Sequence, residues 1–490
     1  MKSLQDVTEC VATDMGHICN VSITRDMRTV ARRVRSEGVS FLTITLPTFA
    51  KGLEQALDAG RIEPHHTPSF HWRRGLPVFL QGFLALIFER STGVLLDAPD
   101  VDAIRAVRQI CLLHSKVLLE CSEKRTRDAY TAYVQCENDL RALPSAIDPS
   151  MLMTLRIAFD GLFGSVCRSL DAALREGSVN YRHGPGATAD RLKGNQKWLQ
   201  KEWPARLGRS FPMDHALLPN PRHWRTLQTV KIVEPGAERP VKVITVPKTL
   251  KTPRIIAVEP TAMQYAQQAI LDGFVRRIES DDTCSQFVGF TDQTVSRDLA
   301  LKGSRDGTLA TLDLSEASDR VSNHLVYELF SWYPALRDAL QDSRSRRADV
   351  PGHGIIRLAK FASMGSAVCF PVEAMVFTAI ALAATMDRQE HRSPRRAIKT
   401  LSGHMRVFGD DIIIPTHLVD PVVDWLTHFG LKVNRNKSFW TGKFREACGG
   451  DYYDGVDVSI HRFRRVLPTT RLDADEIISA VAFRNRCYRT

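Results

Sequence analysis

Hydrophobic and polar positions divide this chain of 490 residues into two parts. Up to about residue 180, apolar residues recur at spacings of three and four, as between residues 103 and 119, and this spacing predicts helices. Residues 41–46 are an exception because they alternate, which predicts a short strand. Further along, residues 374–386 are apolar throughout; the run is too short to span a bilayer and predicts a buried helix.

Between residues 305 and 460, short β-rich runs alternate with helical spacing. One amphipathic helix is predicted through Leu325, Leu329 and Tyr333. The very polar run at 342–349 is predicted to be a surface excursion. Strands and helices mixed in this order indicate an α+β fold rather than a doubly wound sheet.

Two of the predicted strands carry carboxylates. Residues 308–312 predict a strand that ends at Asp313, and residues 407–414 predict a hairpin with Asp410 and Asp411 at its tip. Asp-rich turns are common for purely local hydrogen-bonding reasons. If the strands are neighbours in one sheet, however, three carboxylates meet, and such a cluster repels itself unless a cation is bound.

A metal site of this kind suits nucleotidyl transfer. One ion lowers the pKa of a 3′-hydroxyl, and a second ion neutralises the leaving pyrophosphate. Mg2+ prefers hard oxygen ligands, which carboxylates provide. We therefore expect two Mg2+ ions, with Mn2+ as a substitute.

A second pair of strands is predicted at 241–247 and 254–258. The connection between them carries Lys248, Lys251 and Arg254, which we call the basic connection. It precedes the aspartate strands, where an incoming triphosphate would need positive charge. A solvated basic edge is the alternative interpretation.

Two further features are suited to contact a sugar. Asp319 follows Asp313 by six residues, so its carboxylate could accept a hydrogen bond from a ribose 2′-OH; a residue that complements the helix dipole is the alternative. The small residues Ser363, Gly365 and Ser366 form the 363–366 loop, which could lie against a template or sugar. A plain loop before a helix is the alternative.

Composition narrows the class of protein. Hydrophobic residues make up 43% of the chain, enough for a sizeable core, and the net charge of +11 favours a polyanionic partner. The ten cysteines include no C-x-x-C pair, so we expect reduced thiols rather than a zinc knuckle. Three histidines at 65, 66 and 71 have no acidic partner nearby, which favours a loop over a metal site. The N-terminus lacks the order of a signal peptide, so a cytoplasmic protein is expected.

Several strings together resemble one known family. LDLSEASDR, SMGS followed by CFPVEAMVF, VFGDDIIIP and FREACGGDYYDGVDV look like successive motifs of the replicase catalytic subunit of the leviviruses, which are small positive-strand RNA bacteriophages. FLTITLP, HGPGATAD and VPKTLKTPRIIAVEP resemble upstream segments of that family. The resemblance spans roughly residues 40–460 and implies an RNA-dependent RNA polymerase with a right-hand fold of fingers, palm and thumb.

The resemblance also implies roles for particular residues. Asp313 and Asp410 would be the principal metal ligands, with Asp411 beside them. The basic connection would contact the incoming ribonucleoside triphosphate, and the 363–366 loop would lie near the ribose and template. Lys437 would donate a proton to pyrophosphate, although a surface lysine is the alternative. Ser366 stands where the family usually has Asn. A serine offers one hydroxyl, whereas the Asn amide could make two directed hydrogen bonds. The prediction of sugar discrimination by this loop is therefore weaker than the prediction of catalysis.

We expect four regions. Residues 1–180 would form a mostly helical N-terminal region with part of the fingers or thumb, and residues 181–300 would form fingers with the basic hairpin. Residues 301–460 would form the palm, with a fingers excursion near 335–360. Residues 461–490 would begin a thumb that looks truncated, with a helix around Ile477 that exposes an apolar face.

By family resemblance, the partners would be template and product RNA, the host elongation factors Tu and Ts, and ribosomal protein S1, in the cytoplasm of an infected bacterium and without a membrane. A reverse transcriptase would share the aspartate palm, but Asp319 argues against it. A non-catalytic RNA-binding protein would also suit the positive charge. It would be expected to have lost a carboxylate, and none is missing.

Overall fold

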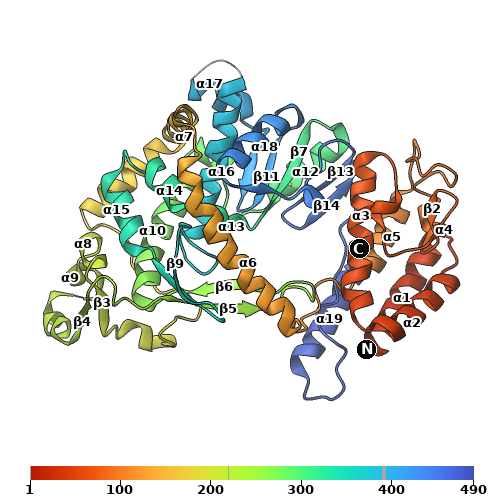
Figure 1. The fold of residues 1–490 in the computed structure, drawn as a ribbon, viewed down its shortest axis with the longest axis horizontal. Coiled ribbons are helices and arrows are strands. Elements are labelled where there is room, and N and C mark those ends of the chain that lie inside the picture. Colours follow the sequence, from red (N-terminus) through yellow and green to blue (C-terminus); the bar gives the residue numbers. More distant parts are fainter. Residues whose placement is uncertain (1, 219, 389–392, 490) are drawn as a thin grey trace.

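A computed structural model describes residues 2–218, 220–388 and 393–489 (Figure 1). It confirms the α+β class, with long helices packed around several small sheets. The N-terminal helices gather at one end of an elongated molecule, and strands β7 and β11 lie near its middle (Figure 1).

The N-terminal region is helical, as predicted. Its elements are α1 (Lys2–Ile18), α2 (Thr24–Glu37), the π-helical turn η1 (Phe41–Thr45), α3 (Leu46–Ala59), β1 (Trp72–Arg73), β2 (Leu76–Pro77), α4 (Gln81–Leu84) and α5 (Val101–Leu112). The strand predicted at 41–46 is wrong. Leu42, Leu46 and Phe49 continue one buried helical face into α3, and that spacing prevails over the local alternation.

Long helices form the largest core. They are α7 (Pro149–Arg175), α10 (Thr261–Ser280) and α16 (Cys369–Arg388), whereas α6 (Glu123–Ala142) contributes to a separate, smaller cluster. The buried helix predicted at 374–386 is confirmed within α16, which is longer than the apolar run and packs against α7. By length and composition α7 and α16 could each cross a membrane, but the apolar part of α16 is almost entirely buried in protein, as is typical of a core helix.

The central sheet has the strand order β10-β11-β7-β12. Its strands are β7 (Leu309–Ser315), β10 (Arg406–Phe408), β11 (Asp411–Pro415) and β12 (Lys432–Val433). All neighbours pair antiparallel, and the hairpin predicted around Asp410 is confirmed. Helix α12 (Thr294–Asp306) directly precedes β7, and helix α18 (Val419–His428) lies between β11 and β12 in the sequence. A separate small sheet contains β13 (Phe444–Ala447), β14 (Gly450–Tyr453) and β15 (Val456–Asp457).

The predicted basic strand pair is confirmed in a second four-stranded sheet of order β6-β5-β8-β9. Its strands are β5 (Val241–Val246), β6 (Arg254–Val258), β8 (Arg347–Val350) and β9 (Gly354–Arg357). The surface excursion predicted at 342–349 is wrong: Asp342 and Arg344 are buried, and β8 lies inside the sheet. Burial is tolerated because these groups are paired, Asp342 with Arg209 at 2.6 Å and Arg344 with backbone carbonyls.

The single helix predicted through Tyr333 is also wrong. The structure contains α13 (Ala317–Arg320), α14 (Asn323–Leu329) and α15 (Pro334–Ser343) instead. Pro334 cannot continue a helix from residue 333 and begins a new one. The remaining elements are short: η2 (Pro64–His66), η3 (Leu143–Ser145), η4 (Gly194–Trp198), β3 (Glu202–Pro204), α8 (Leu207–Ser210), α9 (Met213–Ala216), η5 (Pro221–Thr229), β4 (Lys231–Val233), α11 (Cys284–Phe287), α17 (Pro394–Leu401), η6 (Thr416–Leu418) and η7 (Arg435–Lys437).

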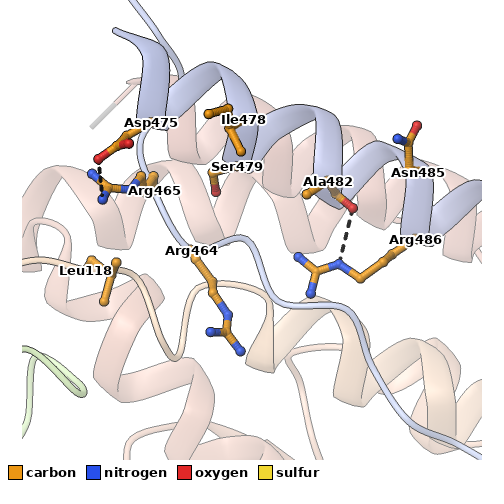
Figure 2. Close-up of a pocket in the computed structure, with 9 residues that line it drawn as sticks. All are labelled: Leu118, Arg464, Arg465, Asp475, Ile478, Ser479, Ala482, Asn485 and Arg486. Atoms are coloured by element: carbon orange, nitrogen blue, oxygen red, sulfur yellow. Dashed lines mark hydrogen bonds and ion pairs between the residues drawn. The ribbon is translucent and has the colours of Figure 1, made fainter. Parts of the chain in front are cut away.

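The last helix, α19 (Ala474–Arg489), is the one predicted around Ile477. It has an exposed apolar side, since Ile478 is 66% exposed, while Phe483 packs on Phe463. A hollow of about 690 Å³ is lined by residues of α19 and of the preceding segment, Arg464 and Arg465 among them. Figure 2 shows these lining residues. None of the predicted site residues lines the hollow. All ten cysteines are free, as expected, and six are buried.

Candidate active site

Strand register brings two of the predicted aspartates together. β11 pairs antiparallel with β7 so that Asp411 lies directly opposite Asp313. Phe408 pairs with Asp411 across the hairpin, which leaves Gly409 and Asp410 as a two-residue turn. Gly409 has φ +61°, and a Cβ there would lie 2.5 Å from the Phe370 ring, so glycine is required on both counts. The expectation that the two aspartate strands are neighbours is confirmed.

Burial and mutual repulsion affect these carboxylates. Burial, reinforced by the charge of Asp313, raises the pKa of Asp410 above its ordinary value. Burial and the charge of Asp410 raise the pKa of Asp411 to about 6, although the Cys448 backbone N–H donates a 2.9 Å hydrogen bond to its carboxylate. An added cation would relieve this repulsion.

The donor types fit Mg2+, because Asp313, Asp410 and Asp411 all offer hard oxygen atoms from adjoining positions. Among the residues that the structure describes, no three His, Cys, Asp or Glu side chains are gathered as a finished metal site. Asp411 is turned to the Cys448 amide, and Asp313 is engaged by other side chains. The residues that could hold the ions are therefore present, and the side chains of Asp313 and Asp411 are bound to protein groups.

Asp313 has two side-chain partners. Its Oδ1 lies 3.2 Å from Lys437 Nζ, and its Oδ2 accepts a 2.8 Å hydrogen bond from Asn434 Nδ2. Burial alone would lower the pKa of Lys437, but the charges of Asp313 and Glu446 raise it above its ordinary value. Lys437 is thus a protonated neighbour of the aspartates rather than an isolated surface lysine.

The basic connection faces the same space. Lys248, Lys251 and Arg254 are all exposed to solvent. Partial desolvation of the Lys248 ammonium, with the charges of Arg254 and Lys437, lowers its pKa, while Asp410 and Asp313 act in the opposite direction. Lys51 of α3 is also exposed and adds a further cation near Lys437: partial desolvation lowers its pKa, and Lys437 and Lys251 contribute to the lowering. Sequence reasoning missed Lys51, since nothing in a helical N-terminal region indicates which side chain reaches a distant sheet.

The 363–366 loop is docked on the basic hairpin. The Ala257 N–H of β6 donates a 2.9 Å hydrogen bond to the Met364 carbonyl. Gly365 has φ +126°, and a Cβ there would lie 2.1 Å from the Ala257 carbonyl oxygen, so no other residue fits. Both serine hydroxyls are bound inside the protein: Ser363 Oγ shares a 3.0 Å hydrogen bond with Tyr133 Oη, and Ser366 Oγ donates one of 3.1 Å to Gln267.

Asp319 lies in the short helix α13, and its Oδ1 accepts a 2.9 Å hydrogen bond from Lys360 Nζ. Its side chain is 21% exposed, whereas that of Lys360 is fully buried. The carboxylate therefore serves as an ion-pair partner, and it also lies in the first turn of the helix, where an acidic residue complements the dipole. The sequence did not predict that Lys360 would pair with Asp319, although Lys360 lies only three residues before Ser363.

The family model and the curated relatives point to one family. Residues 228–471 match the family model described as RNA replicase, beta-chain. The RNA-directed RNA polymerase beta chain of Enterobacteria phage fr is 38% identical over 216 residues, which is 44% of this chain and 36% of that protein. The corresponding chain of Escherichia phage MS2 is 37% identical over 216 residues, again 44% and 36% of the two chains.

The RNA-directed RNA polymerase subunit beta of Escherichia virus Qbeta is 35% identical over 218 residues, or 44% of this chain and 34% of that subunit. The chain thus spans about a third of the length of the curated relatives that it matches. Among solved structures, the RNA-dependent RNA polymerase of BmCPV at elongation state aligns with TM-score 0.39 and 10% identity over 66% of this chain and 31% of that one. The RNA-dependent RNA polymerase of a human picobirnavirus aligns with TM-score 0.33 and 12% identity, over 50% and 52% of the two chains.

Proposed function

Because residues 228–471 belong to the RNA replicase beta-chain family, we propose that this chain is an RNA-directed RNA polymerase that replicates the genome of a positive-strand RNA phage. One observation carries the proposal. The β7–β11 register sets Asp411 opposite Asp313, with Asp410 in the adjoining turn; Lys437 pairs with Asp313, and Lys248 lies within electrostatic reach of Asp410 and Asp313. Carboxylates that face cations on separate segments suit the joining of a nucleoside triphosphate to a growing chain.

Asp313, Asp410 and Asp411 would hold two Mg2+ ions, with Mn2+ as a substitute. Bound there, the ions would lower the pKa of the attacking 3′-hydroxyl and neutralise charge on the leaving pyrophosphate. Lys437 balances the charge of Asp313 across 3.2 Å. The Cys448 N–H keeps the Asp411 carboxylate oriented from the neighbouring turn.

The cations would bind the triphosphate of the incoming ribonucleotide. Lys248, Lys251 and Arg254 come from the one connection between β5 and β6, and Lys248 is electrostatically coupled to Asp410 and Asp313. Lys437 keeps its proton at neutral pH because Asp313 and Glu446 raise its pKa against the effect of burial. It would pass that proton to the pyrophosphate as the bond to the nucleotide breaks.

The sugar would be read by Asp319. Lys360 engages its Oδ1, and the remaining exposed surface of its carboxylate would accept a hydrogen bond from a 2′-OH. The 363–366 loop would contribute shape rather than hydroxyl groups, because Ser363 and Ser366 are already bound to Tyr133 and Gln267. Exposed Met364 is the part of this loop that faces outward.

We further propose that residues 181–300 form the fingers, 301–460 the palm and 461–490 the start of the thumb, with residues 1–180 completing the fingers and thumb. The partners would be template and product RNA together with the host elongation factors Tu and Ts and ribosomal protein S1. The site of action would be the cytoplasm of the infected bacterium.

Primer extension tests the proposal. Purified chain is incubated with a primed RNA template, Mg2+ and either ribo- or deoxyribonucleoside triphosphates. We expect template-dependent extension with ribonucleotides that EDTA abolishes. Equal or better use of deoxyribonucleotides would instead indicate a reverse transcriptase. RNA binding without extension under any metal condition would indicate a non-catalytic protein.

A further inference from the structure

We propose that Glu137, Tyr133 and Lys360 are positioning residues for ribose selection. They tie Asp319 and the 363–366 loop into one buried assembly, so that the carboxylate and the loop present a single rigid surface to the sugar. This inference rests on the proposed function. It extends the site to α6, a helix outside the region matched by the family model.

Lys360 is the centre of the assembly. Its side chain is fully buried, and Nζ lies 2.9 Å from Asp319 Oδ1 and 3.1 Å from Glu137 Oε1. The same Nζ lies 3.5 Å from the centre of the Tyr133 ring, in cation–π contact. A buried ammonium is stable only with such partners, and they raise the pKa of Lys360 although burial alone would lower it.

Glu137 holds Lys360 independently of Asp319. It is fully buried, and its Oε2 accepts hydrogen bonds from the backbone N–H groups of Ala359 and Lys360, the second at 3.3 Å. The segment around Lys360 is further held by Phe361, whose N–H donates a 2.8 Å hydrogen bond to the Val321 carbonyl. The ammonium therefore has a fixed position, and it fixes one oxygen of Asp319.

Exposure leaves Asp319 able to accept another hydrogen bond. Glu137 is sealed from solvent and faces two cations, the Lys360 ammonium at 3.1 Å and the buried Arg344 guanidinium, which lies within electrostatic reach. The Asp319 side chain, in contrast, is 21% exposed, and Lys360 Nζ engages only its Oδ1. Asp319 is therefore the carboxylate of this assembly that a sugar hydroxyl can reach.

Tyr133 connects the same lysine to the loop. Its ring covers Lys360, and its hydroxyl shares a 3.0 Å hydrogen bond with Ser363 Oγ. Burial raises the pKa of Tyr133 to about 12, so the hydroxyl stays neutral and available for that bond. The loop and Asp319 are therefore held through one aromatic side chain on α6.

The docking of α6 explains why these residues meet. Figure 1 shows α6 running diagonally across the molecule beside α13. Cys136 Sγ contacts the Asp319 carbonyl at 3.2 Å, and Asp139 pairs with Arg320 at 3.2 Å. One face of α6, from Tyr133 to Asp139, thus supports the whole turn that carries Asp319.

Glu137→Gln is the decisive variant. The amide preserves shape but removes the second anion of Lys360, whose ammonium would then draw the Asp319 carboxylate inward. Glu123→Gln is the matched control, since Glu123 is exposed on the same helix. Tyr133→Phe keeps the ring over Lys360 but removes the hydrogen bond to Ser363. Its control is Tyr130→Phe, because Tyr130 lies on the same helix face and in the same core cluster. Lys360→Met is unsuitable because it would leave buried Glu137 without a counter-charge.

The measured quantity is the ratio of kcat/KM for ATP to that for dATP in primed extension. We expect Glu137→Gln to lower this ratio about three- to tenfold and Tyr133→Phe to lower it less, with both controls unchanged. Combining Glu137→Gln with Asp319→Ala should lower it no further than Asp319→Ala alone. A purely structural role would reduce activity with both sugars equally and leave the ratio unchanged, which would overturn the inference.

Equilibrium binding separates this inference from the proposed function. ATP and dATP are titrated against the full chain with a primed template ending in a 3′-deoxynucleotide, so that no turnover is needed. A chain that never extends a primer but binds ATP more tightly than dATP, with that preference reduced in Glu137→Gln, would refute polymerase activity and retain the positioning role. Equal binding of both nucleotides by the unaltered chain, or an unchanged preference in Glu137→Gln, would refute the positioning role.

Discussion

Asp313→Asn separates catalysis from folding at the proposed active site. The substitution keeps the shape of the side chain and removes its charge, so Lys437 loses a partner at 3.2 Å. That pair is partly exposed on the lysine side, and such pairs contribute about 1 kcal/mol or less to stability. The amide also loses one acceptor toward Lys437 or Asn434, which costs about 1 kcal/mol more.

The expected catalytic loss is larger. A metal ligand contributes several kcal/mol of transition-state stabilisation, and about 4 kcal/mol corresponds to about 10³-fold in rate. We therefore expect single-turnover extension to fall about 10³-fold or more, while RNA affinity and the melting temperature change little. Asp298→Asn, at an exposed position of α12, makes the same chemical change at a residue outside the proposed metal ligands and should extend normally. Extension by Asp313→Asn within a few-fold of the unaltered chain would refute the assignment of Asp313 as a metal ligand.

Four further outcomes are expected. Asp319→Ala should lower the preference for ribonucleotides over deoxyribonucleotides by about 5- to 150-fold, the equivalent of about 1–3 kcal/mol, as measured by the ratio of kcat/KM values; an unchanged ratio would make Asp319 structural. Lys248→Met should raise the KM for nucleotide or lower the extension rate, whereas loss of RNA affinity alone in a filter-binding assay would assign Lys248 to the template. Mg2+ should raise the melting temperature of the unaltered chain but raise that of Asp410→Asn less, and equal shifts would argue against binding at Asp410. The pKa of Asp411 is about 6 in the folded chain, whereas its ordinary value is 3.8, so as the pH falls the folded state binds this proton before the unfolded state does. The stability of the metal-free chain should therefore gain from this group as the pH falls from above 6 toward 4. Asp411→Asn should lose that gain in denaturant titrations, and an identical pH profile of the two chains would contradict the prediction.

Local sequence was sufficient for the elements whose pattern repeats within a few residues. The hairpin at Asp410 follows from a glycine that tolerates positive φ and from the buried isoleucines of β11. The basic strand pair β5–β6 and the buried helix α16 follow equally from runs of apolar and β-branched residues. The order of the motifs was also enough to indicate the family, because that order is a property of the sequence itself.

Local pattern failed where a distant partner decides the structure. The alternation at 41–46 predicts a strand, but its residues extend the buried face of α3 against the N-terminal core. The polar run at 342–349 predicts exposure, but Asp342 is matched by Arg209, whose sequence position gives no sign of the pairing. A charged residue is buried only when a partner of opposite charge or hydrogen-bonding groups are buried with it, and hydrophobic periodicity does not reveal that partner.

The proposed active site likewise combines residues that the local sequence indicates with residues that only the tertiary structure brings to it. The sequence alone indicates the aspartates, the glycine of the turn and the basic connection, because each lies within a short and chemically distinctive string. Only the tertiary structure sets Asp411 opposite Asp313, adds Lys51 from α3, and places Glu137 and Tyr133 of α6 around Lys360. Tyr133 and Ser363 are 230 residues apart in sequence, and their hydrogen bond exists because α6 packs beside α13, a contact set by the shape and burial of whole helices rather than by any local pattern.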